Sequence, residues 1–334
     1  MVIAIGFEGS ANKLGIGVID GDIILSNKRS TLITPPGQGF KPSQVEAHHR
    51  AKIIELLKSI HQMDAICFTK GPGMGAGLST VAFFARMLSC MYKKPLVEVN
   101  HCVAHIEMGR FITGAQNPVI LYVSGGNTQV IIYHKNRYRI CGETLDIAVG
   151  NCIDRFARLI NVQIVLIRYP MTLRPASTLN KPRILSSYLM VSRVWMYHFL
   201  GYYLISKYKV NNQDFVIKQI ESGDLTPADV CFSLQETVFS MLVEITGVCN
   251  LTKERAMSNI GSNEVLVVGG VGYTMASERG AISYSADERF CIDNGLMIAK
   301  TGQIMFEHGL SSKIEKTRIS QRYRTDAVDI TWRN

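Results

Sequence analysis

Two histidines separated by three residues are the first feature of this sequence that could do chemistry. His101 and His105 stand in the segment NHCVAHIEMGR, directly after an apolar run. Asn100 is a suitable helix N-cap, so both histidines fall near the start of a helix and on one face of it. Imidazoles at this spacing can reach one cation at about 2.0–2.1 Å each. The alternative is a pair of histidines without a ligand, in the core or on the surface.

The residue that follows His101 argues against one familiar metal chemistry. Zinc proteases carry H-E-x-x-H, in which the glutamate is the general base. Here Cys102 takes that place, so a metalloprotease is the less favoured interpretation. A cation at this position would instead orient or polarise a substrate oxygen.

Acidic residues occur at two further places that could belong to a site. The segment GETLDIAVGNCIDRFAR carries Asp146 and Asp154 where a strand gives way to a helix. They could bind ribose hydroxyls or a cation, or could be a helix cap and solvated charges. Asp293, in DERFCIDNG, precedes an apolar helix. It is either the cap of that helix, which the local sequence favours, or a third, oxygen ligand.

Two glycine-rich turns follow strands. SGGN at 124–127 could bring backbone N–H groups close to a phosphate, or could be a hairpin turn, which this motif alone favours. GPGMGAG at 71–77 is neither a Walker A loop nor a good G-x-G-x-x-G. It is compatible with a phosphate loop and equally with the turn that starts a helix.

The elements that must position these residues repeat one plan. Residues 2–19 and 119–133 each read as an apolar strand, a turn of small residues and a second apolar strand. A helix is predicted over 43–60, with Ser43 as its N-cap and Glu46 completing a capping box. Strands and helices alternate, and the repeat predicts a duplicated α/β architecture with mixed sheets.

The composition bears on the cellular compartment of the protein and on whether its net charge indicates nucleic-acid binding. The chain of 334 residues is long enough for two domains, and its net charge is +9. Seven basic residues and no acidic ones fall within 162–212, so the charge belongs to one segment and does not by itself indicate nucleic acid. Eight cysteines without a CxxC pair indicate reduced thiols. No secretory signal is apparent, and the longest apolar run, 194–205, is too short for a bilayer.

Longer motifs, taken in order, resemble one family. They are GFEGSANK, TPPGQGF, TKGPGMG, NHCVAHIEMGR, LYVSGGNTQVI, GETLDIAVGNCIDRFAR, CFSLQETVF, VVGGVG, DERFCIDNG and QRYRTD. In this order they are similar to the universal tRNA N6-threonylcarbamoyladenosine transferases, once named O-sialoglycoprotein endopeptidases, and to the eukaryotic catalytic subunits of the KEOPS complex. The resemblance covers about 1–161 and most of 213–334.

The resemblance implies a fold and a division of the chain. The fold is α/β, of the actin-like ATPase (sugar kinase/heat-shock) type, with two similar domains around a nucleotide cleft. The expected ranges are 1–117 for the first domain, 118–310 for the second and 311–334 for a C-terminal tail.

The resemblance also implies an activity and its residues. The enzymes are acyltransferases that transfer threonylcarbamoyl from threonylcarbamoyl-adenylate to N6 of the adenosine beside the anticodon, in tRNAs that read codons beginning with A. One divalent cation (iron, zinc or magnesium) is implied, and no nucleophile for a covalent intermediate. The implied metal ligands are His101, His105, Tyr122 and Asp293, and the implied adenylate-binding residues are Tyr122, Val123, Ser124, Gly125, Gly126 and Asp154.

Partners and location follow from the same resemblance. The partners would be a small atypical protein kinase, its small binding protein, a dimerising small subunit and tRNA, with no membrane. The location would be the cytoplasm and the nucleus.

Three segments depart from the family pattern. Residues 162–212 match neither the turn nor the helix that bind the nucleotide ribose in the family. GVCNLTK, at 247–253, interrupts a predicted helix, and Tyr273 and Thr274 follow VVGGVG where the family has an asparagine. These departures suggest a mis-spliced transcript, a wrongly predicted coding sequence or a decaying copy of the gene. A catalytically impaired chain that acts as a KEOPS interaction subunit is therefore the alternative function.

Overall fold

The computed structural model describes most of the chain and divides it into two units. The described residues are 1–35, 38–57, 62–159, 218, 220–229, a few positions between 231 and 246, 264–268 and 282–333. By packing, unit 1 comprises 1–118, 132–139 and 284–334, and unit 2 comprises 119–131 and 140–283. The predicted domain ranges stay predictions, and the grouping by packing differs from them in that residues 132–139 and 284–310 lie in unit 1.

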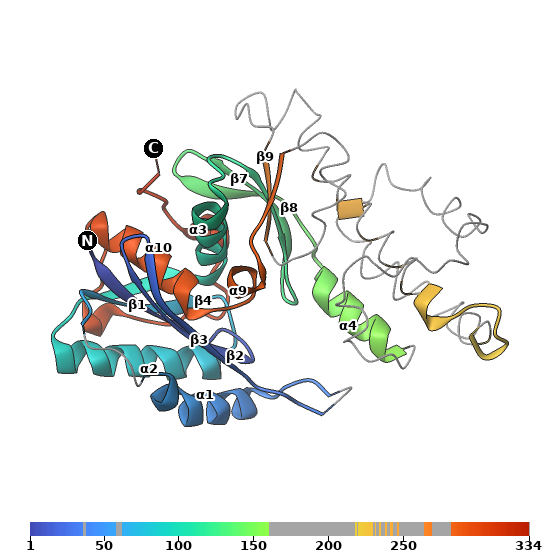
Figure 1. The fold of residues 1–334 in the computed structure, drawn as a ribbon, viewed down its shortest axis with the longest axis horizontal. Helices are drawn as coiled ribbons and strands as arrows, with labels where there is room; N and C mark the ends of the chain where they lie inside the picture. The colour runs from blue at the N-terminus through green and yellow to red at the C-terminus, as the bar shows by residue number, and fades with distance from the viewer. Residues whose placement is uncertain are drawn as a thin grey trace. The chain divides into compact units, whose positions relative to one another are not determined.

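The first sheet has five strands with the parallel ones at one side. Its order is β3-β2-β1-β4-β5, with β1 antiparallel to β2 and parallel to β4 (Figure 1). Strand β2 is antiparallel to β3, and β4 is parallel to β5. The strands are β1 (Ile3–Glu8), β2 (Lys13–Asp20), β3 (Ile23–Thr31), β4 (Ala65–Gly71) and β5 (Leu96–Asn100).

Helices form two buried clusters with this sheet. Helix α2 packs on β4 and against α1, around a cluster that includes Phe7, Phe68 and Val81. Helix α10 packs on β1, β2 and β4 and against α3, around a second cluster that includes Ala104 and Leu296. The helices are α1 (Pro42–Leu57), α2 (Gly75–Tyr92), α3 (His101–Thr113) and α10 (Gly295–Glu307).

The start of α10 presses directly on the sheet. A Cβ on Gly295 would collide with the backbone nitrogen of Gly17, and a Cβ on Gly6 would collide with the backbone of Ala299. Only glycine allows the helix and the strand backbones to approach this closely. The residues just before α10 are therefore held against the ends of β1 and β2.

The second sheet repeats the order of the first. Its order is β10-β9-β6-β7-β8, and β6 is antiparallel to β7 and parallel to β9. Strand β6 thus corresponds to β1, β7 to β2 and β9 to β4. Its elements, with the helix that follows β8, are β6 (Val119–Val123), β7 (Thr128–His134), β8 (Arg137–Glu143), α4 (Val149–Leu159), β9 (Glu264–Val268) and β10 (Ile282–Ser285). The duplication confirms the predicted fold class, α/β with two similar domains of the actin-like type.

One prediction on local structure needs correction, and others concern residues that the structure does not describe. Helix α1 begins at Pro42, and the Lys41 N–H donates to Gln44 Oε1 at 2.9 Å, so the predicted cap at Ser43 is wrong. The segments 162–212 and 247–253, and Tyr273 and Thr274, lie outside the described residues.

Short elements complete the described chain. They are α9 (Glu288–Cys291), which precedes α10, and the 3-10 turns η4 (Ile314–Lys316) and η5 (Thr325–Ala327). Among the residues described, no helix combines the length and the apolar character needed to cross a bilayer.

Candidate metal site

Helix α3 carries the two histidines at its first turn. It follows β5 directly, and Asn100 Oδ1 accepts a hydrogen bond from the Val103 N–H at 3.1 Å, which confirms the predicted N-cap. His101 and His105 lie one turn apart and are 8% and 5% exposed. Their ring centroids are 4.7 Å apart and their planes are nearly perpendicular. The histidines are therefore buried and stand beside one another on one face of the helix.

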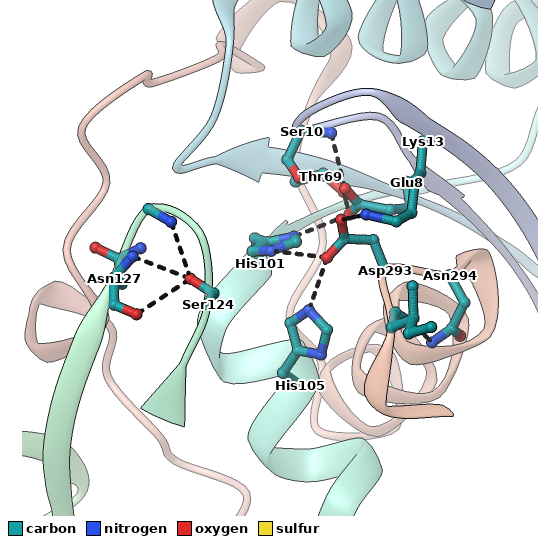
Figure 2. Close-up of polar contacts among 12 residues, drawn as sticks. Glu8, Ser10, Lys13, Thr69, His101, His105, Ser124, Asn127, Asp293 and Asn294 are labelled. Atoms are coloured by element: carbon teal, nitrogen blue, oxygen red, sulfur yellow. Dashed lines mark hydrogen bonds and ion pairs between the residues drawn. The ribbon is translucent and has the colours of Figure 1, made fainter. Parts of the chain in front are cut away.

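The junction of α9 and α10 brings a carboxylate to these rings. Asn294, and not Asp293, caps α10: its Oδ1 accepts from the Met297 N–H at 3.0 Å. Its Nδ2 donates to the Ile292 carbonyl at 2.8 Å. The cap role that the local sequence favoured for Asp293 is therefore wrong. With the cap supplied by its neighbour, the Asp293 carboxylate turns toward α3 (Figure 2).

The three side chains converge in the way a cation requires. Asp293 Oδ1 lies 3.2 Å from His105 Nε2 and 3.6 Å from His101 Nε2. The ligand atoms of all three residues lie within 4.8 Å of one another. Two ligands at about 2.1 Å from a tetrahedral ion stand about 3.4 Å apart, between the two measured separations. Two imidazoles and a carboxylate suit zinc or iron better than magnesium, which prefers oxygen. The donor set therefore fits a transition-metal ion.

Two charged residues that the sequence analysis did not single out complete the cluster. Glu8 ends β1, is fully buried and places Oε2 3.1 Å from His101 Nδ1. Lys13, at the start of β2, places Nζ 3.1 Å from Asp293 Oδ2. Both lie in the quoted motif GFEGSANK. The signal for Glu8 was available, since a carboxylate at the end of an otherwise apolar strand needs a partner.

Burial and charge act against each other on the acidic groups. Burial raises the pKa of the Asp293 carboxyl, but the hydrogen bond from His105 and the charges of Lys13 and His101 outweigh it and hold the pKa well below its usual range. Burial likewise raises the pKa of Glu8, and the charge and hydrogen bond of His101 outweigh it, so the net direction is down. Both carboxylates therefore stay ionised and available to a cation.

The two histidines are pushed in opposite directions. Burial lowers the pKa of both rings. For His101 the charge and hydrogen bond of Glu8 overcome burial, and the pKa is raised. For His105 burial prevails over the hydrogen bond to Asp293, and the pKa is lowered. The cluster thus combines His101, whose protonated form is favoured by Glu8, with His105, whose neutral form is favoured by burial.

In unit 2 the SGGN segment forms the hairpin turn between β6 and β7. Ser124 N donates to the Asn127 carbonyl at 2.8 Å, and Ser124 Oγ accepts from the Gly126 and Asn127 N–H groups. The start of α4 is tied to this turn, because Gly150 N donates to the Ser124 carbonyl at 3.2 Å. The motif is therefore a hairpin turn joined to a helix start. Its predicted role in phosphate binding stays a prediction.

The remaining predicted ligand-binding residues also lie in unit 2. Tyr122 is 2% exposed on β6, where it pairs with Gln129 of β7. Val123 ends that strand, and Asp154 lies on α4. The roles of Tyr122 as a fourth metal ligand, and of these residues and the turn in binding an adenylate, stay predictions.

The other glycine-rich segment, 71–77, starts a helix in unit 1. Helix α2 begins within it at Gly75. Met74 N donates to the Ser10 carbonyl at 2.7 Å, so the segment packs against the turn that follows Glu8. The turn that starts a helix is therefore the interpretation that the structure supports.

Fold and site together define a class of protein: a duplicated α/β protein of the actin-like type that carries a cluster of two histidines and one aspartate. Comparison with known proteins narrows this class. The family model described as "tRNA N6-adenosine threonylcarbamoyltransferase" matches residues 23–300. The chain belongs to this family.

Relatives from animals and fungi support the assignment over the whole length. A Xenopus laevis tRNA N6-adenosine threonylcarbamoyltransferase is 48% identical over 354 aligned residues, covering 100% of both chains. The protein of that name from Homo sapiens is 46% identical, with 100% of both chains covered. The one from Gibberella zeae is 49% identical, with 99% of this chain and 97% of the relative covered.

The solved structures to which the chain is similar are distant in sequence. A ROK hexokinase from Thermus thermophilus is 13% identical and has a TM-score of 0.42, with 92% of this chain and 100% of that chain covered. EutJ from Carboxydothermus hydrogenoformans is 15% identical and has a TM-score of 0.41, with 89% of each chain covered.

Proposed function

We propose that this chain transfers a threonylcarbamoyl group from threonylcarbamoyl-adenylate to N6 of the adenosine beside the anticodon, in tRNAs that read codons beginning with A. Family membership supports the transferase activity on tRNA. The observation that carries the chemistry is the convergence of His101, His105 and Asp293, from segments almost 200 residues apart.

The reaction needs positioning more than a covalent partner. A carbon–nitrogen bond forms between the acyl carbon and N6 of the adenosine. The bond from that carbon to the phosphate oxygen of the adenylate breaks, AMP leaves and N6 loses a proton. Holding acyl donor and amine in contact accounts for a large part of such an acceleration. No covalent intermediate on the chain is required.

The cluster would hold one divalent cation through His101, His105 and Asp293, with Tyr122 as a fourth ligand. When bound, such an ion polarises carbonyl or carboxylate oxygens and stabilises the charge that develops on them. Lys13 neutralises the second oxygen of Asp293 at 3.1 Å and so fixes the carboxylate. The cluster therefore presents one carboxylate oxygen and two ring nitrogens in a fixed arrangement.

The adenylate would bind at the turn between β6 and β7. Among the described residues, and apart from their neighbours in the chain, no heavy atom lies within 4 Å of the position that a Cβ on Gly125 or Gly126 would take. A ligand can therefore come close to this backbone. The turn is held by hydrogen bonds to the Ser124 side chain and by the hydrogen bond from Gly150 N to the Ser124 carbonyl. Asp154, on the same helix as Gly150, is the residue for a ribose hydroxyl.

Partners and location are part of the same proposal. The chain would work with a small atypical protein kinase, the small binding protein of that kinase and a dimerising small subunit, in the KEOPS complex. It would act on tRNA in the cytoplasm and nucleus. The identity of the metal, iron or zinc before magnesium, is proposed from the donor set.

The test is an assay for the modified nucleoside. The purified chain, with these partners, is incubated with threonylcarbamoyl-adenylate and an unmodified tRNA, and the digested tRNA is analysed by mass spectrometry. We expect threonylcarbamoyladenosine from the wild type. We expect at least a hundredfold less from a His101→Ala, His105→Ala double variant. A wild-type complex that assembles and binds tRNA without forming product would contradict the proposal and favour the interaction subunit.

A further inference from the structure

We propose that Glu8 is a positioning residue of the metal site: it holds the imidazole of His101 so that Nε2, and not Nδ1, faces the cation. This inference rests on the metal site of the proposed function. It adds a residue from β1 that touches neither the ion nor the substrate and acts only through His101.

The contact between the two residues defines which ring nitrogen remains for the metal. Glu8 Oε2 lies 3.1 Å from His101 Nδ1, and the other nitrogen, Nε2, lies 3.6 Å from Asp293 Oδ1. An ionised carboxylate can only accept, so Nδ1 must carry the proton. A metal needs an unprotonated ring nitrogen. With Nδ1–H donated to Glu8, that nitrogen is Nε2.

Glu8 is itself held so that it cannot follow a movement of the ring. Its Oε2 accepts from Thr69 Oγ1 at 2.6 Å, and its Oε1 accepts from the Ser10 N–H at 2.7 Å. Thr69 is fully buried on β4, the parallel neighbour of β1, and Glu8 is also 0% exposed. The carboxylate is thus held by β4 and by the turn that follows β1, without a cation. Figure 2 shows it between Thr69 and His101, on the side away from His105.

The second histidine has a different environment, so we expect the loss of Glu8 to weaken metal binding and not to abolish it. His105 contacts Asp293 through Nε2 at 3.2 Å, and its ring lies one turn further along α3. Loss of Glu8 therefore releases one ligand of the set and leaves the other histidine and the aspartate in place. Loss of a carboxylate behind a metal-bound histidine typically costs about 10–100-fold in affinity.

The experiment measures Zn²⁺ affinity of the full chain by competition with a chelator. For Glu8→Gln we expect affinity to fall about 10–100-fold while the stoichiometry stays at one ion per chain. Glu107→Gln is the matched control: Glu107 is also buried, 2% exposed, and lies on α3 itself, but its carboxylate accepts hydrogen bonds from Tyr138 and Arg110. We expect that variant to bind Zn²⁺ within about threefold of the wild type.

A second measurement needs no substitution of Glu8. Nitrogen NMR of histidine in the Zn²⁺-bound wild type reports which ring atom is coordinated, with His101→Gln to assign the signal. We expect Nε2 coordination and a protonated Nδ1 for His101. Coordination through Nδ1, or wild-type affinity in a folded Glu8→Gln variant, would overturn this inference alone. A wild type that binds no metal would overturn the proposed metal site as well.

Discussion

Two buried carboxylates belong to the surroundings of α3, one from β1 at the start of the helix and one on the helix itself, and they are held in different ways. Glu8 meets His101 at the first turn, beside a second carboxylate. Glu107, in the middle of α3, accepts from Tyr138 OH and the Arg110 guanidinium, both at 2.7 Å, and from Trp332 Nε1 at 3.2 Å. Burial alone does not distinguish them, since both are almost completely covered.

The C-terminal residues close the cluster around Glu107. Arg333 donates to Tyr138 OH and to the Gln116 carbonyl, both at 2.8 Å, and its guanidinium lies 3.9 Å from the centre of the Tyr133 ring. Arginine, tyrosine and tryptophan keep their protons at neutral pH. An imidazole gives up its proton in this range, and a cation can take its place. We conclude that a buried carboxylate marks a ligand site when its partners are imidazoles. It has a structural role when its partners are side chains that keep their protons at neutral pH.

The largest expected effect comes from removing the carboxylate of Glu107. Glu107→Ala removes the acceptor shared by Arg110, Tyr138 and Trp332, and leaves the fully buried Tyr138 hydroxyl without the carboxylate to which it donates. We expect the free energy of unfolding to fall by about 3–5 kcal/mol, measured by chemical denaturation. Zn²⁺ affinity of the folded fraction should stay within about threefold of the wild type. A larger loss of affinity would show that the two clusters are not separate.

The next effect is on the metal and leaves the fold intact. Asp293→Asn removes the charge between the two histidines, while Asn294 keeps its hydrogen bond to Met297 N and so the cap of α10. We expect at least a hundredfold loss of Zn²⁺ affinity, about 2.7 kcal/mol, measured by chelator competition. The free energy of unfolding of the metal-free chain should change by less than about 1–2 kcal/mol. A loss of stability without a loss of affinity would make Asp293 a structural residue.

A third histidine extends the comparison, because it is buried and, in the part of the chain that the structure describes, forms no hydrogen bond with a carboxylate. His49, on α1, is fully buried, with Nδ1 3.1 Å from His48 Nδ1. Burial, and then the charge of His48, lower the pKa of His49 to about 4, although Glu8 acts in the opposite direction. The unfolded chain takes up this proton near pH 6.5, before the folded one does.

Stability should therefore depend on pH through His49. Its contribution is complete above about pH 6.5, is lost as the pH falls toward 4 and changes no further below that. We expect a loss of up to about 3 kcal/mol over this range, measured by urea denaturation of the metal-free chain. His49→Asn should reduce the slope. An unchanged slope in that variant would show that other groups cause the pH dependence.

The smallest expected effect concerns Arg333, which lies at the edge of the cluster around Glu107. Arg333→Lys keeps the charge but cannot hold Tyr138 and Gln116 together while lying over Tyr133. We expect the free energy of unfolding to fall by about 1 kcal/mol, measured as a shift in the denaturation midpoint. Arg137→Lys is a suitable control, since Arg137 pairs with the exposed Asp329. Equal effects of the two changes would argue against a special role of Arg333.

The sequence predicted the repeated hairpins and the helix start at Asn100, because both depend on residues close together in the chain. It did not settle Asp293, because a cap and a ligand look alike when Asn294 stands beside it. Glu8 was missed for another reason. Its partner His101 is 93 residues away, and only the pairing of β1 with β4 and of β4 with β5 brings the two together. Spacing alone could not show this.

The most direct measurement is a crystal structure of the chain soaked with Zn²⁺, recorded at the zinc absorption edge. The account predicts one strong anomalous peak about 2.0–2.1 Å from Nε2 of His101 and of His105, and about 2.0–2.2 Å from a carboxylate oxygen of Asp293. The Glu8 carboxylate should remain on Nδ1 of His101. The absence of a peak there, or an ion held by other residues, would contradict the account.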